Sequence, residues 1–277
     1  MINNEGDRFR IHHQDRKFAY VVFEGYSQII KRRKQEVISG SIKNPFKPIV
    51  YGIGYYGFHN ISEVKQRDHR YKRIYYIWKD MIRRCYHDKN SVYYNRVTIC
   101  DKWKSFKNFY YWCLSDESNY NDSFYIDKDL LGDGKEYSPE KCLFVPKYIN
   151  NLFIDMNNFN GYRYQYGLYY VQIGKPRIHL GTYNNRYVSS MIYMIAKRYH
   201  ILTISYTAFI NGEIPLHYME RVISIFNKGK DYRETIKFNK YLNRYIQICD
   251  QRLSKASNSL ERDIRNKVRR GFIDRSE

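Results

Sequence analysis

One stretch, residues 126–151, constrains the fold more than any other part of the sequence. It reads IDKDLLGDGKEYSPEKCLFVPKYINN. A short apolar strand ends in Asp127-Lys128-Asp129, a polar loop with two glycines follows, and a second strand covers 142–145. Pro146 then suits the first position of a helix, because its fixed backbone angle is already helical and its missing N–H is not needed there. The pattern predicts a β-hairpin followed directly by a helix.

Acidic side chains on this hairpin and asparagines on the helix carry its chemistry. Asp127 and Asp129 flank Lys128, and Asn150 and Asn151 fall in the predicted helix. Carboxylate and amide oxygens hold hard divalent cations, and such a cation placed against a phosphate promotes hydrolysis. We therefore predict a small metal-dependent nuclease site in which Asp127 and Asn150 (or Asn151) bind Mg²⁺ or another divalent cation. Asp129 is then a second ligand or orients water, and Lys128 contacts the scissile phosphate.

The overall charge predicts a polyanionic partner. The 277 residues carry a formal net charge of +20, with a pI near 9.6. Between Met156 and Gly212 there are six Lys and Arg residues and no Asp or Glu. Such a balance is typical of proteins that bind nucleic acid, so we expect a polyanionic partner of this kind.

Other partners and compartments are disfavoured by composition. No apolar run approaches the ~18 residues that a membrane span needs, so no membrane is expected. The polar first ten residues predict no secretory signal, and the five cysteines contain no C-x-x-C pair. We expect a cytoplasmic protein with reduced, buried thiols.

The chain before the hairpin predicts a small β unit and two helices. Strands are expected at 18–23 and 27–34, the second ending in a basic run that is either a solvated face or a phosphate contact. Apolar residues at helical spacing over 74–85 predict an amphipathic helix. A shorter helix follows over 103–113, with Ser105 as its N-cap.

A three-stranded sheet and a helix are expected after the hairpin. The strands are 162–166, 169–173 and 177–183, and the helix begins after Asn184 or Asn185. On the middle strand one set of alternating side chains packs on the helix, and the other faces outward, where a β-ribbon can read the major groove. The predicted DNA-binding residues are Arg163, Tyr170, Gln172, Lys175, Arg177 and His179.

The basic tail after residue 228 has a thin apolar stripe. Its members are Phe238, Leu242, Tyr245, Cys249, Leu253, Ala256 and Leu260. The stripe either docks on the body of the protein, which we favour, or pairs with a second copy as a short coiled coil, giving a homodimer. The predicted fold class is α+β, with parts at residues 1–60, 61–156, 157–227 and 228–277.

The order of several motifs resembles a known group. Residues 76–86 (YIWKDMIRRCY), 99–103 (ICDKW), 126–129 (IDKD) and 137–140 (YSPE) follow one another as in phage-borne homing endonucleases of the HNH type. Gly161, YVQI at 170–173 and LGTY at 180–183 resemble the Apetala/ethylene-response-type DNA-binding domain. The resemblance covers roughly residues 18–226. It implies a degenerate HNH core with a ββα-metal-like fold, an Apetala-type reader, and metal-dependent cleavage of double-stranded DNA.

The sequence departs from the HNH pattern at one chemical position. Lys128 stands where such nucleases carry the histidine that acts as general base. Three readings follow: a metal held by Asp127 or Asp129 supplies hydroxide, His87 serves as the base, or the site is inactive. In the last case the chain is a sequence-specific DNA-binding regulator. Binding of RNA or of a partner protein is a weaker alternative, because the sheet lacks the aromatic signature of ribonucleoprotein domains.

Overall fold

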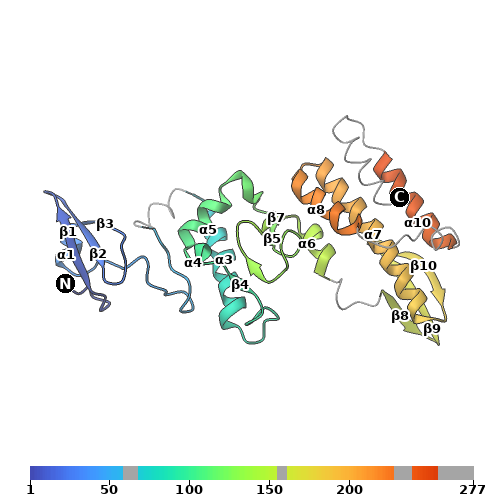
Figure 1. The fold of residues 1–277 in the computed structure, drawn as a ribbon, viewed down its shortest axis with the longest axis horizontal. Coiled ribbons are helices and arrows are strands. Elements are labelled where there is room, and N and C mark those ends of the chain that lie inside the picture. Colours follow the sequence, from blue (N-terminus) through green and yellow to red (C-terminus); the bar gives the residue numbers. More distant parts are fainter. Residues whose placement is uncertain (59–67, 155–160, 228–238, 255–277) are drawn as a thin grey trace. The chain divides into compact units, whose positions relative to one another are not determined.

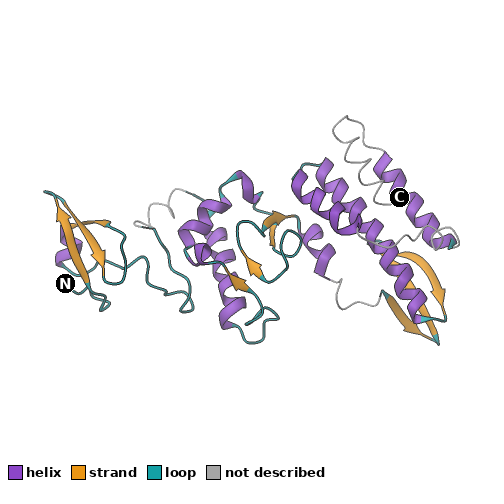
Figure 2. Ribbon diagram, in the orientation of Figure 1, coloured by secondary structure: helices purple, strands orange, loops and turns teal. Residues whose placement is uncertain are grey.

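The structure is a computed structural model, and it describes residues 1–58, 68–154, 161–227 and 239–254 (Figure 1). It confirms the predicted α+β class. The strands form small separate sheets, and the helices differ widely in length (Figure 2).

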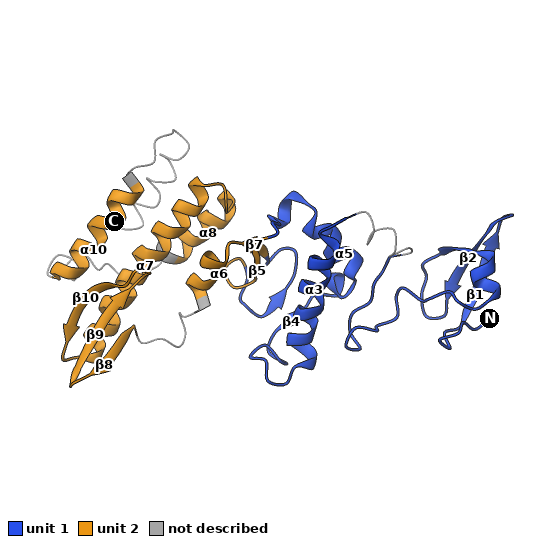
Figure 3. Ribbon diagram, turned by 180° about the vertical axis from the view of Figure 1, so that it is seen from behind, with its two compact units in different colours: residues 1–122, 132–142 blue, residues 123–131, 143–277 orange. Residues whose placement is uncertain are grey.

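The chain divides into two compact units (Figure 3). Unit 1 contains residues 1–122 and 132–142, and unit 2 contains residues 123–131 and 143–277. The division expected from the sequence, with boundaries near residues 60, 156 and 227, stays a prediction. Within unit 2, the hairpin strands and the helix behind Pro146 share one core with the helices that follow the three-stranded sheet.

Unit 1 begins with an antiparallel sheet in the order β1-β2-β3. Its inner face buries Val21, Phe23 and Ile30. The predicted strand 18–23 is confirmed as β2, whereas the strand predicted at 27–34 is shorter and β1 was not predicted. The elements of unit 1 are β1 (Phe9–Gln14), β2 (Phe18–Phe23), β3 (Ile30–Arg33), α1 (Lys34–Ile38), α3 (Tyr71–Ile82), η1 (Arg83–His87), β4 (Thr98–Ile99), α4 (Asp101–Lys104), α5 (Phe106–Cys113), η2 (Asp116–Ser118) and β6 (Glu136–Tyr137).

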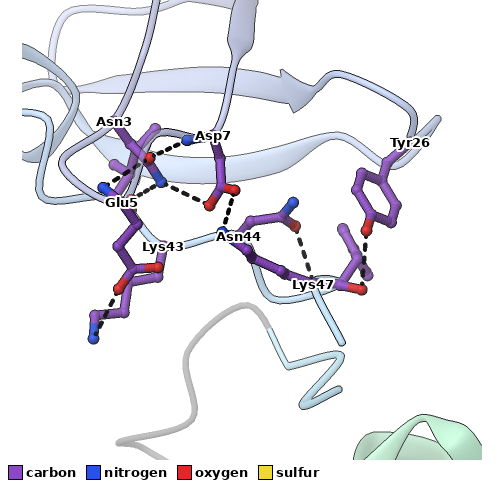
Figure 4. Close-up of polar contacts among 9 residues, drawn as sticks. Asn3, Glu5, Asp7, Tyr26, Lys43, Asn44 and Lys47 are labelled. Atoms are coloured by element: carbon purple, nitrogen blue, oxygen red, sulfur yellow. Dashed lines mark hydrogen bonds and ion pairs between the residues drawn. The ribbon is translucent and has the colours of Figure 1, made fainter. Parts of the chain in front are cut away.

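Polar contacts fix the loops beside this sheet (Figure 4). The Asn3 side chain donates to the Ile42 carbonyl at 2.9 Å and accepts from the amides of Glu5 and Asp7. The Lys47 ammonium lies 2.7 Å from the Asp7 carboxylate. The first residues are thereby tied to the segment that follows α1.

The two predicted helices of unit 1 are confirmed. Helix α3 buries Ile74, Trp78 and Met81 on one stripe and continues as the π-helical turn η1. The Trp78 indole N–H donates to the Trp103 carbonyl at 2.7 Å, which joins α3 to α4. Ser105 caps α5 as predicted, since its hydroxyl accepts from the Asn108 amide.

Unit 2 begins with the predicted hairpin, formed by β5 (Tyr125–Asp127) and β7 (Leu143–Val145), with Asp127 opposite Leu143. Helix α6 (Lys147–Ile154) follows Pro146, whose carbonyl accepts from the amides of Ile149 and Asn150. The hairpin and helix expected from residues 126–151 are therefore confirmed. The remaining elements are β8 (Tyr162–Gln165), β9 (Leu168–Ile173), β10 (Ile178–Tyr183), α7 (Arg186–Ile210), α8 (Leu216–Asn227) and α10 (Lys240–Ser254).

The three-stranded sheet has the order β10-β9-β8 and is antiparallel throughout. Helix α7 lies along one face of it (Figure 1). The Asn185 side chain caps this helix by accepting from the amides of Tyr187 and Val188. Val171 and Ile173 of the middle strand are buried against the helix, as the alternation predicts.

Helix α10 docks on the same unit, which confirms the favoured prediction for the tail. Leu242, Tyr245 and Cys249 are buried against α7 and the sheet. Leu253 is buried in the core that the hairpin shares with α6, α7 and α8. Phe238, Ala256 and Leu260 lie outside the described residues, and pairing with a second copy stays a prediction. Among the described helices, none combines the length and apolar character of a membrane span.

Candidate functional site

The Asp127 carboxylate is buried at the end of β5, with an exposed fraction of 2%. It accepts hydrogen bonds from the backbone amides of Asp129 and Leu130, both at 3.4 Å, and from the Tyr218 hydroxyl at 3.3 Å. The two amides belong to the turn that leaves the strand, and Tyr218 comes from α8. The carboxylate therefore holds a turn and a helix together.

Burial also shifts the protonation of this group. Loss of solvation raises the pKa of Asp127 to about 6, and the charge of Asp129 acts in the same direction. The hydrogen bonds from Asp129, Leu130 and Tyr218 oppose the shift without cancelling it. In turn, burial and the Asp127 charge raise the pKa of Tyr218, so its hydroxyl remains a donor.

Lys128 is buried beside this carboxylate, with an exposed fraction of 4%. Its ammonium lies 2.5 Å from the Asp129 carboxylate, which is the more exposed partner of the ion pair. Arg221 of α8 donates from Nε to the Leu130 carbonyl at 3.1 Å. Two cationic side chains thus bind the turn that follows Asp127.

This donor set fits a structural carboxylate better than a metal site. Each Asp127 oxygen already accepts from the protein, and Asp129 is paired with the Lys128 ammonium. Mg²⁺ normally keeps several waters in its shell, which a 2% exposed carboxylate does not accommodate. Asn150 lies on α6, which packs against β5. Over the described ranges no three His, Cys, Asp or Glu side chains are grouped to hold an ion.

His87, the alternative general base, lies in unit 1. It is exposed at the end of η1, and its ring stacks on Tyr51 with centroids 4.6 Å apart. The chemistry predicted for Asp127, Lys128, Asp129, Asn150 and His87 stays a prediction.

The outer face of the β8–β10 sheet carries the other predicted residues. Gln172 of the middle strand is exposed and lies opposite His179 of β10, which is also exposed. Tyr170, two residues earlier, is half-buried between Arg163 of β8 and Thr182 of β10. The middle strand thus presents Tyr170 and Gln172 away from α7, as the alternation predicts.

A bulge in β10 sets the direction of His179. The pairing with β9 shifts register between His179 and Gly181, so Leu180 points into the core. Gly181 has a φ of +112°, and a Cβ there would lie 2.3 Å from the Tyr183 hydroxyl oxygen. Only glycine suits this position, because it tolerates both the backbone angle and the contact.

Two further basic side chains lie at one end of the sheet. Lys175 and Arg177 are exposed in the turn between β9 and β10. With Arg163 they place three permanent positive charges around a face that the sequence leaves without acids from Met156 to Gly212. Within the described strands and turns of this sheet, positive charge is therefore in excess.

The sequence did not reveal what surrounds these residues. Tyr241 of α10 has its ring centroid 5.5 Å from that of His179, and Lys240 lies 5.1 Å from the Tyr241 ring centroid. Tyr218 and Arg221, which hold the Asp127 turn, were also missed. Helical spacing predicted that the tail would dock, but no local signal says which strand or turn a distant helix will meet.

Comparison of the chain with protein-family models, with curated proteins and with solved structures found no match.

Proposed function

We propose that the protein binds double-stranded DNA through the outer face of the β8–β10 sheet. The observation that carries the proposal is a set of exposed donors on the outer face of this sheet and in the turn at one end of it, while the opposite face is packed on α7. The donors are Arg163, Gln172, Lys175, Arg177 and His179. Because α7 packs on the opposite face, the outer side chains are held at fixed spacing. Recognition of bases requires such fixed spacing.

The dimensions of the face suit a major groove. Neighbouring strands lie ~4.8 Å apart, so the outer strands of this sheet are ~10 Å apart, compared with a groove width of ~12 Å. Gln172, at the centre, has the donor and acceptor that pair with adenine N7 and N6. Arg163, Lys175 and Arg177, around it, suit phosphates or guanine. The sheet with α7 is our candidate for the Apetala-type module that the sequence resembles.

Cleavage is not part of this proposal. The buried, hydrogen-bonded Asp127 and the Lys128–Asp129 ion pair support a structural role for the hairpin. We therefore place the protein nearer to a DNA-binding regulator built on a degenerate HNH-like core than to a nuclease.

Selection from a randomised duplex library, followed by Gln172→Ala, tests the proposal. Loss of a base contact should cost about 1–3 kcal/mol at one position of the selected site and leave other positions unchanged. Arg244→Gln, which removes an exposed charge from α10, serves as the control and should not alter the preference at any position. Failure to select any duplex sequence, or an equal loss for all sequences with Gln172→Ala, would count against base recognition by this strand.

A further inference from the structure

The N-terminal sheet has an outer face that the proposed duplex interface does not use. Ala19, Val21 and Phe23 of the central strand β2 are buried in the core of this sheet. Strand alternation therefore directs Phe18 and Tyr20 to the other side, where both are half-exposed. Two adjacent aromatic rings on a central strand form a surface on which flat groups can stack.

A third ring extends this surface. His13 of β1 lies opposite Tyr20, and the two rings stack with centroids 4.0 Å apart and planes 14° from parallel. A register shift between Ile11 and His13 accompanies this placement. His13 is exposed, so the ring of this stacked pair that faces solvent is an imidazole. A nucleic-acid base can continue such a stack, because every base has a π-face.

Basic side chains surround the rings. Lys31 of β3 pairs with Tyr20, and its ammonium lies 4.1 Å from the Phe18 ring centroid. Arg33 lies opposite Phe18 at one end of the face, and Arg10 of β1 lies opposite Val22 at the other. Both arginines are exposed. Aromatic rings interleaved with cations suit a chain that carries both bases and phosphates.

The nearby acids are engaged in other contacts. Glu5 and Asp7 pair with Lys43 and Lys47 in the loops shown in Figure 4. The Asp15 carboxylate accepts from two amides of the β1–β2 turn. The Glu36 carboxylate accepts from the backbone amide of Arg33 at the start of α1, and Glu24 lies 4.0 Å from Arg8 at the end of the sheet. Asp15 also interacts electrostatically with Lys31. Among the residues that the structure describes, however, no ion pair occupies Lys31, Arg10 or Arg33.

We propose that this face, formed by His13, Phe18, Tyr20 and Lys31 with the flanking arginines, binds single-stranded nucleic acid. Bases stack on the exposed imidazole, and phosphates pair with Lys31 and its neighbours. A duplex keeps its bases stacked on one another, so it offers the rings no free base faces. The proposal is independent of duplex binding by the β8–β10 sheet.

Fluorescence anisotropy with the full chain tests the proposal. The probes are labelled oligo-dT and oligo-U of about 12 nucleotides, within the span of known single-strand sites, and a labelled duplex. His13→Ala removes the exposed ring, and His13→Phe keeps a ring for stacking. His69→Ala, an exposed histidine elsewhere in unit 1, is the matched control.

Removal of the ring should lower affinity for single strands about 30-fold, the central value for one stacked base. His13→Phe and His69→Ala should stay close to wild type, and duplex affinity should be unchanged. Lys31→Gln should reduce the salt slope for single strands by about 0.7 per lost phosphate contact. Binding of oligo-dT alone, of oligo-U alone or of both would identify DNA, RNA or either as the natural strand.

Three results would overturn the proposal. They are unchanged single-strand affinity in His13→Ala, an equal loss for strand and duplex, and a loss in His13→Phe as large as in His13→Ala. If His13→Ala unfolds the sheet, His13→Phe and Lys31→Gln still test the proposal. Retained single-strand binding by His13→Phe, together with a reduced salt slope for Lys31→Gln, supports stacking beside a phosphate contact. A large loss of binding by His13→Phe, or an unchanged salt slope for Lys31→Gln, refutes the proposal.

Discussion

Asp127→Asn separates a structural carboxylate from a metal ligand. Burial raises the pKa of Asp127 to about 6 from an ordinary value of 3.8. A proton bound more tightly in the folded state stabilises the fold. That contribution is fully present below pH 3.8 and is lost as the pH rises through about 6. The pKa of Asp127 differs by roughly 2 between the folded and unfolded states, which corresponds to a free energy of roughly 3 kcal/mol.

The variant side chain resembles the protonated carboxyl group at every pH. The free energy of unfolding of Asp127→Asn, taken relative to that of wild type, should therefore rise by roughly 2.5 kcal/mol from pH 4 to pH 7. Other titrating groups are common to both proteins and cancel in the difference. Glu220→Gln, which removes an exposed carboxylate from the helix that carries Tyr218, is the control for loss of a carboxylate.

Urea unfolding followed by circular dichroism at several pH values is the assay. All three tryptophans, at 78, 103 and 112, lie in unit 1, so tryptophan fluorescence follows that unit alone and provides an internal control. Circular dichroism also follows α7, α8 and α10 of unit 2. A difference that does not change with pH would refute the raised pKa. Stabilisation of wild type by Mg²⁺ that disappears in Asp127→Asn would show that the carboxylate binds a cation.

Three other perturbations have defined outcomes. Burial lowers the pKa of His200 to about 4 from 6.5. Unit 2 should therefore lose roughly 3 kcal/mol of stability as the pH falls from 6.5 to 4. His200→Gln should flatten this loss in urea unfolding, and an unchanged slope would contradict the shift. Leu242→Ala should cost about 2–5 kcal/mol in the same assay, because it opens a cavity between α10 and α7; a cost near zero would mean that α10 is not docked. With Mg²⁺ or Mn²⁺, wild type and Asp127→Ala should leave duplex DNA equally intact, and nicking by wild type alone would establish a nuclease.

Local patterns predicted elements well in this chain. The helical stripe containing Ile74, Trp78 and Met81 and the caps Ser105 and Asn185 lie where the sequence places them. The alternation along 169–173 also gave the correct inner and outer faces. These features depend on residues within a few positions of one another, so they can be predicted from the local sequence alone.

Long-range packing was not predictable in the same way. Tyr218 meets Asp127 across 91 positions of the chain, and no periodicity reports such a contact. The same contact joins the hairpin to α8, which lies beyond the three-stranded sheet in the chain. The sequence singled out Asp127 as a candidate site residue, whereas its burial and its hydrogen bonds are seen only in the folded structure.

The salt dependence of duplex binding tests the central claim most directly. Arg163→Gln, Lys175→Gln and Arg177→Gln combined remove three charges from the sheet face, and Arg244→Gln alone is the control. Each lost phosphate contact lowers the slope of log affinity against log salt by about 0.9, so three lower it by about 2.7. The advantage of wild type over the triple variant should therefore shrink about 40-fold between about 50 and about 200 mM salt. A slope unchanged by the triple variant would show that duplex DNA binds elsewhere or not at all.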